Sequence, residues 1–383
     1  MTPSRIAPMR GRSPNEPHRT ATPLELFFDL VFVVAIARAG SGLHHAVAEH
    51  HFTEGIIRYA MVFFGIWWAW MNFSWFASAY DVDDIPYRLT VFLQMTGVLI
   101  FTAGIPEMFA AQDFTLGVIG YVVMRLAMVI QWLRAARGDV AHRITARQYA
   151  LGIAVLQAYW VLLLLAPQQF FLPGFVAGAG LELLVPAWAE RSRMTPWHPH
   201  HIAERYGLMT IIVLGESVLA ASIATGQAIE SGRARSDLAP LIAGGLLIVY
   251  SLWWLYFYRP VHHLLTSYRR AFVWGYGHYF VFAAAAAVGA GLAVALDQDS
   301  GKSAIGDRAA GAAVAIPAAL YLSSLWLLHG RQEHRPVRFI TPSAIGLILL
   351  APLTGQPVLA TGLILVLLLA TKLVLLQSSA SSV

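Results

Sequence analysis

The chain has 383 residues, of which 57% are hydrophobic and only 12% are charged. A soluble domain carries about 25% charged residues, so this composition excludes an ordinary soluble protein and predicts a polytopic membrane protein. Cysteine is absent, which excludes disulfides and thiolate metal sites. The positive net charge comes from arginines in short loops, where they set membrane topology, so nucleic acid is not an expected partner.

A membrane-spanning helix needs about 20 mostly apolar residues. Runs of this kind predict an all-α, polytopic transmembrane helix bundle of about 12 spans. In chain order the predicted spans are 24–46, 56–79, 88–109, 115–136, 146–166, 168–188, 204–225, 238–258, 271–296, 308–330, 338–355 and 357–377. The last two are joined by the short stretch from Thr354 to Pro357, so either a hairpin or one long broken helix fits this end.

The basic residues alternate between the connecting segments in a way that predicts orientation. With the N-terminus placed in the cytoplasm, most arginines fall in inside segments, and the outside loops hold Arg233, Arg235, Lys302 and Arg308. Loops rich in Lys and Arg stay on the cytoplasmic side. The sequence therefore predicts a multi-pass protein of the bacterial cytoplasmic (inner) membrane with both termini in the cytoplasm.

The domain organisation follows from the same pattern. Residues 1–22, rich in arginine and proline, and residues 378–383, rich in serine, are predicted to be disordered tails around a single transmembrane domain at 23–377. The second span carries Trp67, Trp68 and Trp70, and the eighth carries Trp253 and Trp254. This likeness predicts two parallel six-helix repeats, 23–188 and 201–377, related by an axis along the membrane normal.

Two acids in the first span are the strongest functional signal. Glu25 and Asp29 lie four residues apart and therefore share one helix face. A carboxylate in hydrocarbon is costly unless it is paired, so such a residue is a functional hypothesis by default. Thr22 and Pro23 form a helix start, so an N-terminal capping role also fits Glu25. Capping does not account for Asp29, which lies more than one turn into the helix.

Other charges within the spans need partners as well. Arg205 and Glu216 of the seventh span are eleven residues apart and too distant to pair directly. Arg38 and Arg125 have no acid nearby on their own helices, which predicts a tertiary pair between one of them and Asp29 or Glu216. The predicted polar core, or ion and substrate pathway, consists of Glu25, Asp29, Arg38, Arg125, Glu204, Arg205 and Glu216.

An acidic loop separates the second and third predicted spans, with Asp81, Asp83, Asp84 and then Arg88. Clustered aspartates can hold Mg²⁺ and a diphosphate, but that chemistry requires a second acidic cluster, which no inside loop supplies. Capping of the third span, or pairing with arginines, fits the loop better. Adjacent histidines elsewhere point in different directions on a helix, so no metal site is predicted, and no catalytic residue or cofactor is predicted either.

Two stretches resemble a known family. Pro23-Leu24-Glu25-Leu26-Phe27-Phe28-Asp29-Leu30-Val31-Phe32-Val33 resembles the opening signature of the bacterial low temperature requirement A family, and the segment from His201 through Glu204, Arg205 and Gly215-Glu216-Ser217 resembles its second signature. The loop from Tyr80 to Arg88 fits as well. The resemblance spans nearly the whole chain and implies a bacterial membrane protein, but the family name describes a growth phenotype and implies no reaction.

Three function classes remain open. The leading expectation is a transporter or ion-conducting protein, not an enzyme, whose partners are the lipid bilayer and a small ion or solute. The second is an intramembrane enzyme acting on a lipid or isoprenoid. The third is a structural stress-adaptation protein without a substrate. A transporter predicts that Asp29 and Glu216 face one water-accessible vestibule, an enzyme predicts an opening to lipid beside Asp81–Asp84, and a packing role predicts acids sealed by arginines.

Overall fold

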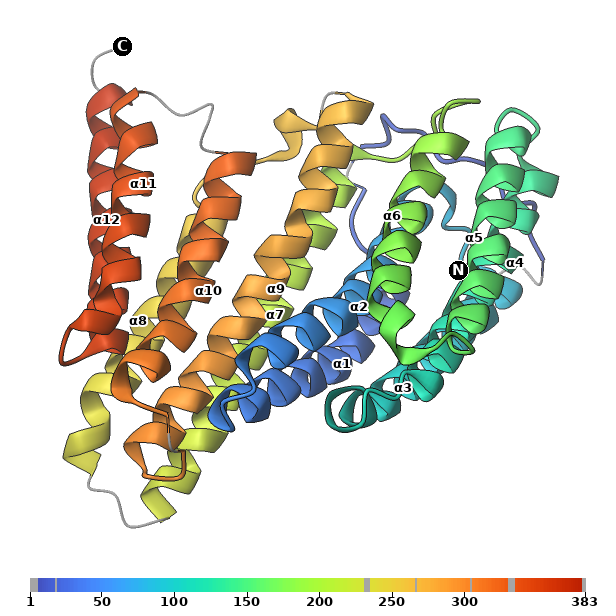
Figure 1. Ribbon diagram of the computed structural model, residues 1–383. Coiled ribbons are helices and arrows are strands. Elements are labelled where there is room, and N and C mark those ends of the chain that lie inside the picture. Colours follow the sequence, from blue (N-terminus) through green and yellow to red (C-terminus); the bar gives the residue numbers. More distant parts are fainter. Residues whose placement is uncertain are drawn as a thin grey trace. The chain divides into compact units, whose positions relative to one another are not determined.

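The computed structural model describes residues 6–17, 19–230, 235–265, 267–303, 305–329 and 335–380. Within these ranges the chain is all α-helical and contains no strand. Twelve α-helices form the fold (Figure 1): α1 (Pro23–Ala48), α2 (Phe52–Tyr80), α3 (Ile85–Ala110), α4 (Thr115–Gly138), α5 (Arg143–Leu163), α6 (Phe171–Ala189), α7 (Pro199–Glu230), α8 (Arg235–Phe257), α9 (Tyr268–Asp299), α10 (Asp307–Leu328), α11 (Arg335–Leu350) and α12 (Pro357–Ala380). Short 3₁₀ helices occur at Gln168–Phe170, His262–Leu264 and Ala351–Leu353.

Each predicted span coincides with one of these helices, and the all-α prediction is confirmed. Nine helices in the described residues are long and apolar enough to cross a membrane. Helices α2, α5 and α11 are not among the nine, so the count of 12 spans stays a prediction. At the C-terminal end α11 and α12 are separate helices that pack against each other, which decides in favour of the hairpin.

The chain divides into two compact units, and the division does not follow the predicted repeats. Unit 1 comprises Met1–Arg38 and Ala60–Tyr206, and unit 2 comprises Ala39–Tyr59 and Gly207–Val383. Helices α1, α2 and α7 are each divided, so that one part of the helix belongs to unit 1 and the other part to unit 2. The two parallel six-helix repeats remain a prediction.

In unit 1, helices α3, α4, α5 and α6 pack in succession, each on the next (Figure 1). The closest approach is between α3 and α4 and depends on glycine. A Cβ atom added to Gly120 would overlap the backbone of Phe101 and Gly97. Small residues of this kind let transmembrane helices approach closely enough to gain van der Waals contact, which replaces the hydrophobic driving force that lipid does not supply.

In unit 2, α9 is a deeply buried helix with a run of five alanines at Ala283–Ala287. Its small side chains let α10 pack against it, and a Cβ atom at Gly291 would overlap the carbonyl group of Ala313. Polar side chains also bond to the α9 backbone, because Tyr59 and Ser217 donate to the carbonyls of Ala283 and Ala285 at 2.7 Å and 2.9 Å. Helix α12 packs against α8 and α11 in the same unit.

The described residues of the N-terminal segment, for which the sequence predicts a disordered tail, make contacts within unit 1. Met9 and Arg19 are buried, and the amide of Arg12 donates to the carbonyl of Ala79 at 2.8 Å. The amides of Ala7 and Gly11 donate to carboxylates of Asp84 and Asp139. The segment is held by acceptors on distant parts of the chain, which its own composition does not reveal. Residues 1–5, 18 and 381–383 lie outside the described residues.

The α3–α4 contact gives a first testable prediction. Gly120→Ala should lower the free energy of unfolding by about 1–3 kcal/mol, because the added methyl group meets backbone that cannot rotate away. Thermal unfolding of the purified protein in detergent measures the effect. Gly180→Ala in α6 is the matched control, since nothing lies within 4 Å of its added Cβ atom. Equal melting temperatures for the two variants would contradict the prediction.

Candidate functional site

Arg205, near the start of α7, is fully buried in unit 1 and pairs with two carboxylates of α1. Its Nη1 atom lies 2.9 Å from Oε1 of Glu25, and its Nη2 atom donates to Oδ1 of Asp29. The indole nitrogen of Trp70 on α2 also donates to Oδ1 of Asp29, at 2.7 Å. Nε2 of His201, one turn before Arg205, lies 3.1 Å from Oε1 of Glu25. We call Glu25, Asp29, His201 and Arg205 the Arg205 cluster.

The start of α1 fixes the position of Glu25. The amide of Thr22 donates to Oε2 of Glu25 at 2.7 Å, and the amide of Glu25 lies 3.3 Å from Oγ1 of Thr22 and donates to it. This reciprocal pair is a capping box. One oxygen of Glu25 therefore closes the helix start while the other faces Arg205. Because Asp29 lies one turn further along the same face, it is brought to the same guanidinium.

The Arg205 cluster is not fully hydrogen-bonded. Asp29 Oδ2 and Arg205 Nε are buried and have no hydrogen-bond partner among the residues that the structure describes. Buried polar atoms without a partner are rare in native proteins. The cluster therefore retains acceptor and donor capacity for a proton, an ion or a water molecule.

A second buried acid, Glu182 of α6, lies elsewhere in unit 1. It forms an ion pair with Arg125 of α4, with Nη2 and Oε2 separated by 2.9 Å. Four neutral donors from α2, α4 and α5 complete its surroundings: Trp68 Nε1 at 2.9 Å, Tyr121 Oη at 3.1 Å, Trp160 Nε1 at 3.2 Å and Gln157 Nε2 at 3.5 Å. Both carboxylate oxygens are thus occupied, in contrast to Asp29. We call Glu182 and these five donors the Glu182 cluster.

Each aspartate of the acidic loop has a partner. Asp84 caps α3 by accepting from the amide of Tyr87 at 2.8 Å, and it also accepts from Arg134 Nη2 at 2.7 Å. Asp83, which has a positive φ of 46°, receives two bonds of 2.8 Å from exposed Arg88. The loop therefore has the capping and pairing roles expected from its sequence.

Asp81 is, like Asp84, a buried aspartate of this loop that contacts the N-terminal segment. Its Oδ2 atom lies 3.7 Å from Arg19 Nη2 and 3.8 Å from Arg12 Nη1. Burial in protein raises the pKa of Asp81 to about 6, and nearby Glu25 adds to this increase while the two arginines oppose it. Asp81 is thus ionised at neutral pH but gains a proton in mild acid.

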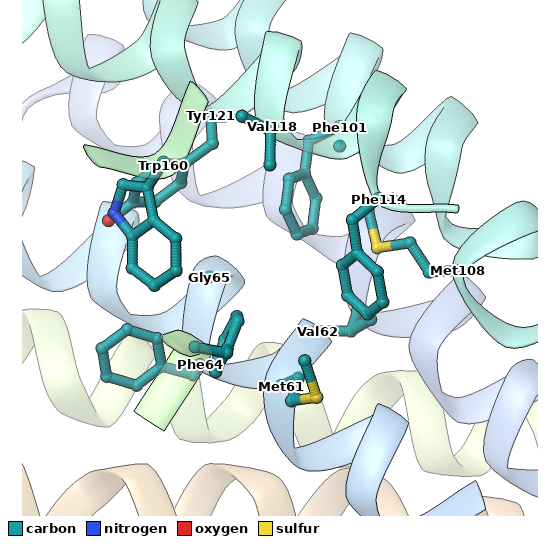
Figure 2. A pocket seen from close by; sticks show the side chains of 12 residues that line it. Met61, Val62, Phe64, Gly65, Phe101, Met108, Phe114, Val118, Tyr121 and Trp160 are labelled. Carbon is teal, nitrogen blue, oxygen red and sulfur yellow. The ribbon is translucent and has the colours of Figure 1, made fainter. Parts of the chain in front are cut away.

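An apolar cavity of about 40 Å³ lies within unit 1. Figure 2 shows methionine and aromatic side chains around it. Tyr121 and Trp160, which donate to Glu182, are among its lining residues, whereas no residue of the Arg205 cluster lines it. A larger cavity of about 540 Å³ lies in unit 2, and Gln298, Asp299, Asp307 and Gln356 line it.

The predicted arginine pairing is wrong. Arg125 pairs with Glu182 and Asp29 pairs with Arg205, whereas the sequence suggested a pair between Arg38 or Arg125 and Asp29 or Glu216. Arg38 is exposed. A fully buried arginine pairs with the acid that helix packing brings within hydrogen-bond distance. Here each arginine pairs with an acid on a different helix, and spacing along the sequence does not predict such a pair.

The remaining predicted residues have simple environments. Glu204 is half-buried and accepts from the amide of Ala21 at 3.2 Å. Glu216 is half-buried on the part of α7 that belongs to unit 2, whereas Asp29 belongs to unit 1. That Asp29 and Glu216 face one vestibule stays a prediction. Throughout the described ranges, no group of three or more acids and histidines is arranged to hold a metal ion.

Sequence reasoning missed Glu182, Trp70, His201 and Arg19 as members of these clusters. Glu182 carried a usable signal, because it is a single acid within the apolar run 168–188 and such residues are functional or paired. Trp70 carried none of its own, since tryptophan is common at membrane interfaces, and His201 was marked only as the first residue of the second stretch that resembles the family. Arg19 was assigned to the tail and therefore not considered as a partner.

The family model for the bacterial low temperature requirement A protein matches residues 20–378. The chain belongs to this family. The match includes every residue of the Arg205 cluster and of the Glu182 cluster. This chain is also 26% identical, over 257 residues, to an uncharacterized protein of Rhizobium meliloti. The aligned region covers 64% of this chain and 60% of the relative. No solved structure matches this chain.

The Arg125–Glu182 pair gives a second prediction. Arg125→Ala should lower the free energy of unfolding by about 3–5 kcal/mol, because it leaves a buried carboxylate without its counter-charge. Arg88→Ala is the matched control, since it breaks an exposed arginine–aspartate pair worth at most about 1 kcal/mol. Chemical unfolding in detergent measures both, and similar losses for the two variants would contradict the pairing energetics described here.

The raised pKa of Asp81 gives a third prediction. Between about pH 4, where an aspartate in the unfolded chain ionises, and about pH 6, the folded protein holds a proton that the unfolded chain has lost. The contribution of Asp81 to stability must therefore fall as the pH rises through this window. Asp81→Asn removes the effect, so its melting temperature should improve relative to that of the unmodified protein from pH 4 to pH 6. A constant difference across this range would show that the pKa is not raised.

Proposed function

We propose that this low temperature requirement A family protein is a transporter or ion-conducting protein and that the Arg205 cluster is its polar centre. The observation that carries the proposal is the unsatisfied oxygen of Asp29. This acid lies at 0% exposure in a helix that qualifies as a membrane span, and its Oδ2 atom accepts no hydrogen bond from the described residues. A group with spare acceptor capacity in such a place can take up a proton or a cation.

The energetic argument supports the same proposal. Buried ion pairs are often no more stabilising than apolar side chains of the same volume, because the desolvation of the charges offsets their attraction. Stability alone therefore gives no reason to place two acids, one arginine and one histidine together in unit 1. Charged residues within membrane segments are associated with ion and proton pathways.

The two acids would have different roles. Glu25 is fixed by the capping box with Thr22, so it serves as a constant counter-charge for Arg205. Asp29 is held through one oxygen only, by Trp70 and Arg205. We assign to Asp29 the change of partner or of protonation state that an ion-translocating cycle needs. Arg205 lies between both acids. When Asp29 binds a cation or a proton, the guanidinium of Arg205 would give up its bond to Asp29 and pair with Glu25 alone.

The proposed setting is the bacterial inner membrane, with the start of α1 and the acidic loop at the cytoplasmic side. The arginine-rich segments beside Arg134 and Arg191 support this orientation, since basic connecting segments stay in the cytoplasm. The proposed substrate is a small ion or solute, as the sequence predicts.

One observation favours a second candidate, a stabilising membrane protein without a substrate. Glu25, Asp29 and Arg205 are all fully buried, and acids sealed by arginines are what a packing role predicts. The enzyme alternative has no such support, because Asp81, Asp83 and Asp84 are each engaged by an arginine and so do not form an open metal-binding set. We propose that the protein is not an enzyme.

Ion flux in proteoliposomes tests the leading proposal. A pH-sensitive dye and a panel of monovalent cations report movement by the unmodified protein. Asp29→Asn keeps the size of the side chain but not its charge, so we expect at least a tenfold loss of flux. Glu216→Gln tests the second predicted acid in the same assay.

Asp113→Asn is the matched control, since it makes the same change at an exposed position between α3 and α4, and it should leave flux unchanged. Equal flux through Asp29→Asn and the unmodified protein would remove the mechanism proposed for Asp29. No flux through the unmodified protein above that of empty liposomes would favour the stabilising role.

A further inference from the structure

The N-terminal strap, residues 6–17 and 19–22, follows the surface of unit 1 and is anchored by its backbone. The amides of Ala7, Gly11 and Arg12 donate to Asp84, Asp139 and the carbonyl of Ala79, respectively. The backbone of Met9 lies so close to Gly138 that a Cβ atom added to Gly138 would overlap the Met9 backbone. The strap is therefore held along its length, independently of the side chain of Arg19.

Arg19 turns from the strap into the protein. Its side chain is only 3% exposed, and its Nη2 atom donates to the carbonyl of Ala77, at the end of α2, at 3.2 Å. The same nitrogen lies 3.8 Å from Oε1 of Glu25 and 3.7 Å from Oδ2 of Asp81. Nη1 of Arg19 donates to the carbonyl of Thr20 at 2.9 Å, so two carboxylates and two carbonyls surround a single guanidinium.

The contacts of Arg19 with its acids are long. The other buried arginines of unit 1 approach their acids closely, with 2.9 Å between Arg125 and Glu182 and 2.9 Å between Arg205 and Glu25. Distances of 3.7–3.8 Å are within ion-pair range but beyond hydrogen-bond length. Arg19 is therefore attracted by charge without being locked by directional bonds to either carboxylate.

The charge balance explains why a cation belongs there. Glu25, Asp29 and Asp81 supply three carboxylates, and among the described ion pairs Arg205 is the one arginine of a helix that pairs with them. The other two arginines in ion-pair range of these acids, Arg12 and Arg19, come from the strap. Arg12 is also paired with Glu16 of the strap, so Arg19 is the strap cation that is most available to the buried acids. Without the strap the helices would carry excess negative charge in a poorly hydrated place, which is costly.

A second observation points to the same location. Oη of Tyr87 is buried and has no hydrogen-bond partner among the described residues, and it lies within electrostatic range of Asp81, Glu25 and Arg19. Nε of Arg19 is likewise buried without a partner. Oη of Tyr87 and Nε of Arg19 are thus two buried polar atoms near Asp81 and Glu25 whose hydrogen-bonding capacity is unused among the described residues.

We propose that Glu25, Asp81 and the carbonyl of Ala77 form a binding site for a small monovalent cation of the guanidinium type, and that Arg19 occupies it as a tethered ligand. A free cation of this class competes with Arg19 for the site. The strap then acts as an intramolecular competitor that sets which cations are admitted. The proposal concerns binding and is independent of whether ions cross the membrane.

Chemical rescue tests the proposal in the full-length protein in detergent. Arg19→Ala empties the site but leaves the backbone anchors of the strap in place. Guanidinium chloride at millimolar concentration, far below the molar range that unfolds proteins, should raise the melting temperature of Arg19→Ala by several degrees in a saturable manner, since a ligand that binds only the folded state stabilises it. The unmodified protein should not respond.

Matched controls separate the site from general effects. Urea has the same planar shape without the charge, and sodium chloride supplies ionic strength, so neither should reproduce the rise. Arg12→Ala removes a second, more exposed strap arginine that also lies in ion-pair range of Asp81, and this variant should not respond to guanidinium. Adding Asp81→Asn to Arg19→Ala should weaken guanidinium binding at least tenfold. An equal response of Arg19→Ala and the unmodified protein, or an equal response to sodium chloride, would overturn the proposal.

If Arg19→Ala folds only when it is purified with guanidinium, the proposal is supported. If it folds under neither condition, Arg19→Lys decides, because its ammonium keeps the charge but lacks the planar fork of a guanidinium. Guanidinium should then still stabilise this variant saturably, and no response would overturn the site. Because the readout is binding, a negative flux experiment with Asp29→Asn leaves this test unaffected.

Discussion

The burial of Arg205 between Glu25 and Asp29 is the interaction on which the arrangement of unit 1 depends. A guanidinium removed from water requires counter-charges, and the two carboxylates that supply them lie one turn apart on α1. Their shared face fixes the rotation of α1 about its axis, and the bond from Trp70 to Asp29 adds α2 to the same contact. One charge requirement thus determines how segments from three helices meet.

The two buried acids Glu182 and Asp29 of unit 1 differ in how their carboxylate oxygens are hydrogen-bonded. Glu182 is surrounded by five donors that occupy both of its oxygens. Hydrogen bonds to both carboxylate oxygens make the packing around Glu182 specific, although Nε and Nη1 of Arg125 have no hydrogen-bond partner among the described residues. Asp29 is satisfied through one oxygen only. Both acids are equally inaccessible, but one oxygen of Asp29 has no hydrogen-bond partner among the described residues, whereas both oxygens of Glu182 have one.

The acidic loop and the strap extend this electrostatic arrangement to the end of the helices. Asp84 and Asp139 offer carboxylate oxygens to backbone amides of the strap, while Arg19 and Arg12 return positive charge to Asp81. Carboxylates of unit 1 thus hold the backbone of the strap, and arginines of the strap neutralise the charge of Asp81. Polar residues that would look unrelated along the chain therefore form one connected system.

The sequence by itself indicated the membrane class, the position of each helix and the family, and it predicted Glu25, Asp29 and Arg205 as members of one polar core. Hydropathy, helix periodicity and capping depend on residues that are near one another along the chain, so a single sequence contains them. Only the tertiary structure decided which charges meet. Asp29 and Arg205 are separated by 176 residues and Arg125 and Glu182 by 57, and such pairs follow from helix packing. For the same reason the contacts of the N-terminal segment could not be predicted, since their acceptors, Asp84, Asp139 and the carbonyl of Ala79, belong to other parts of the chain.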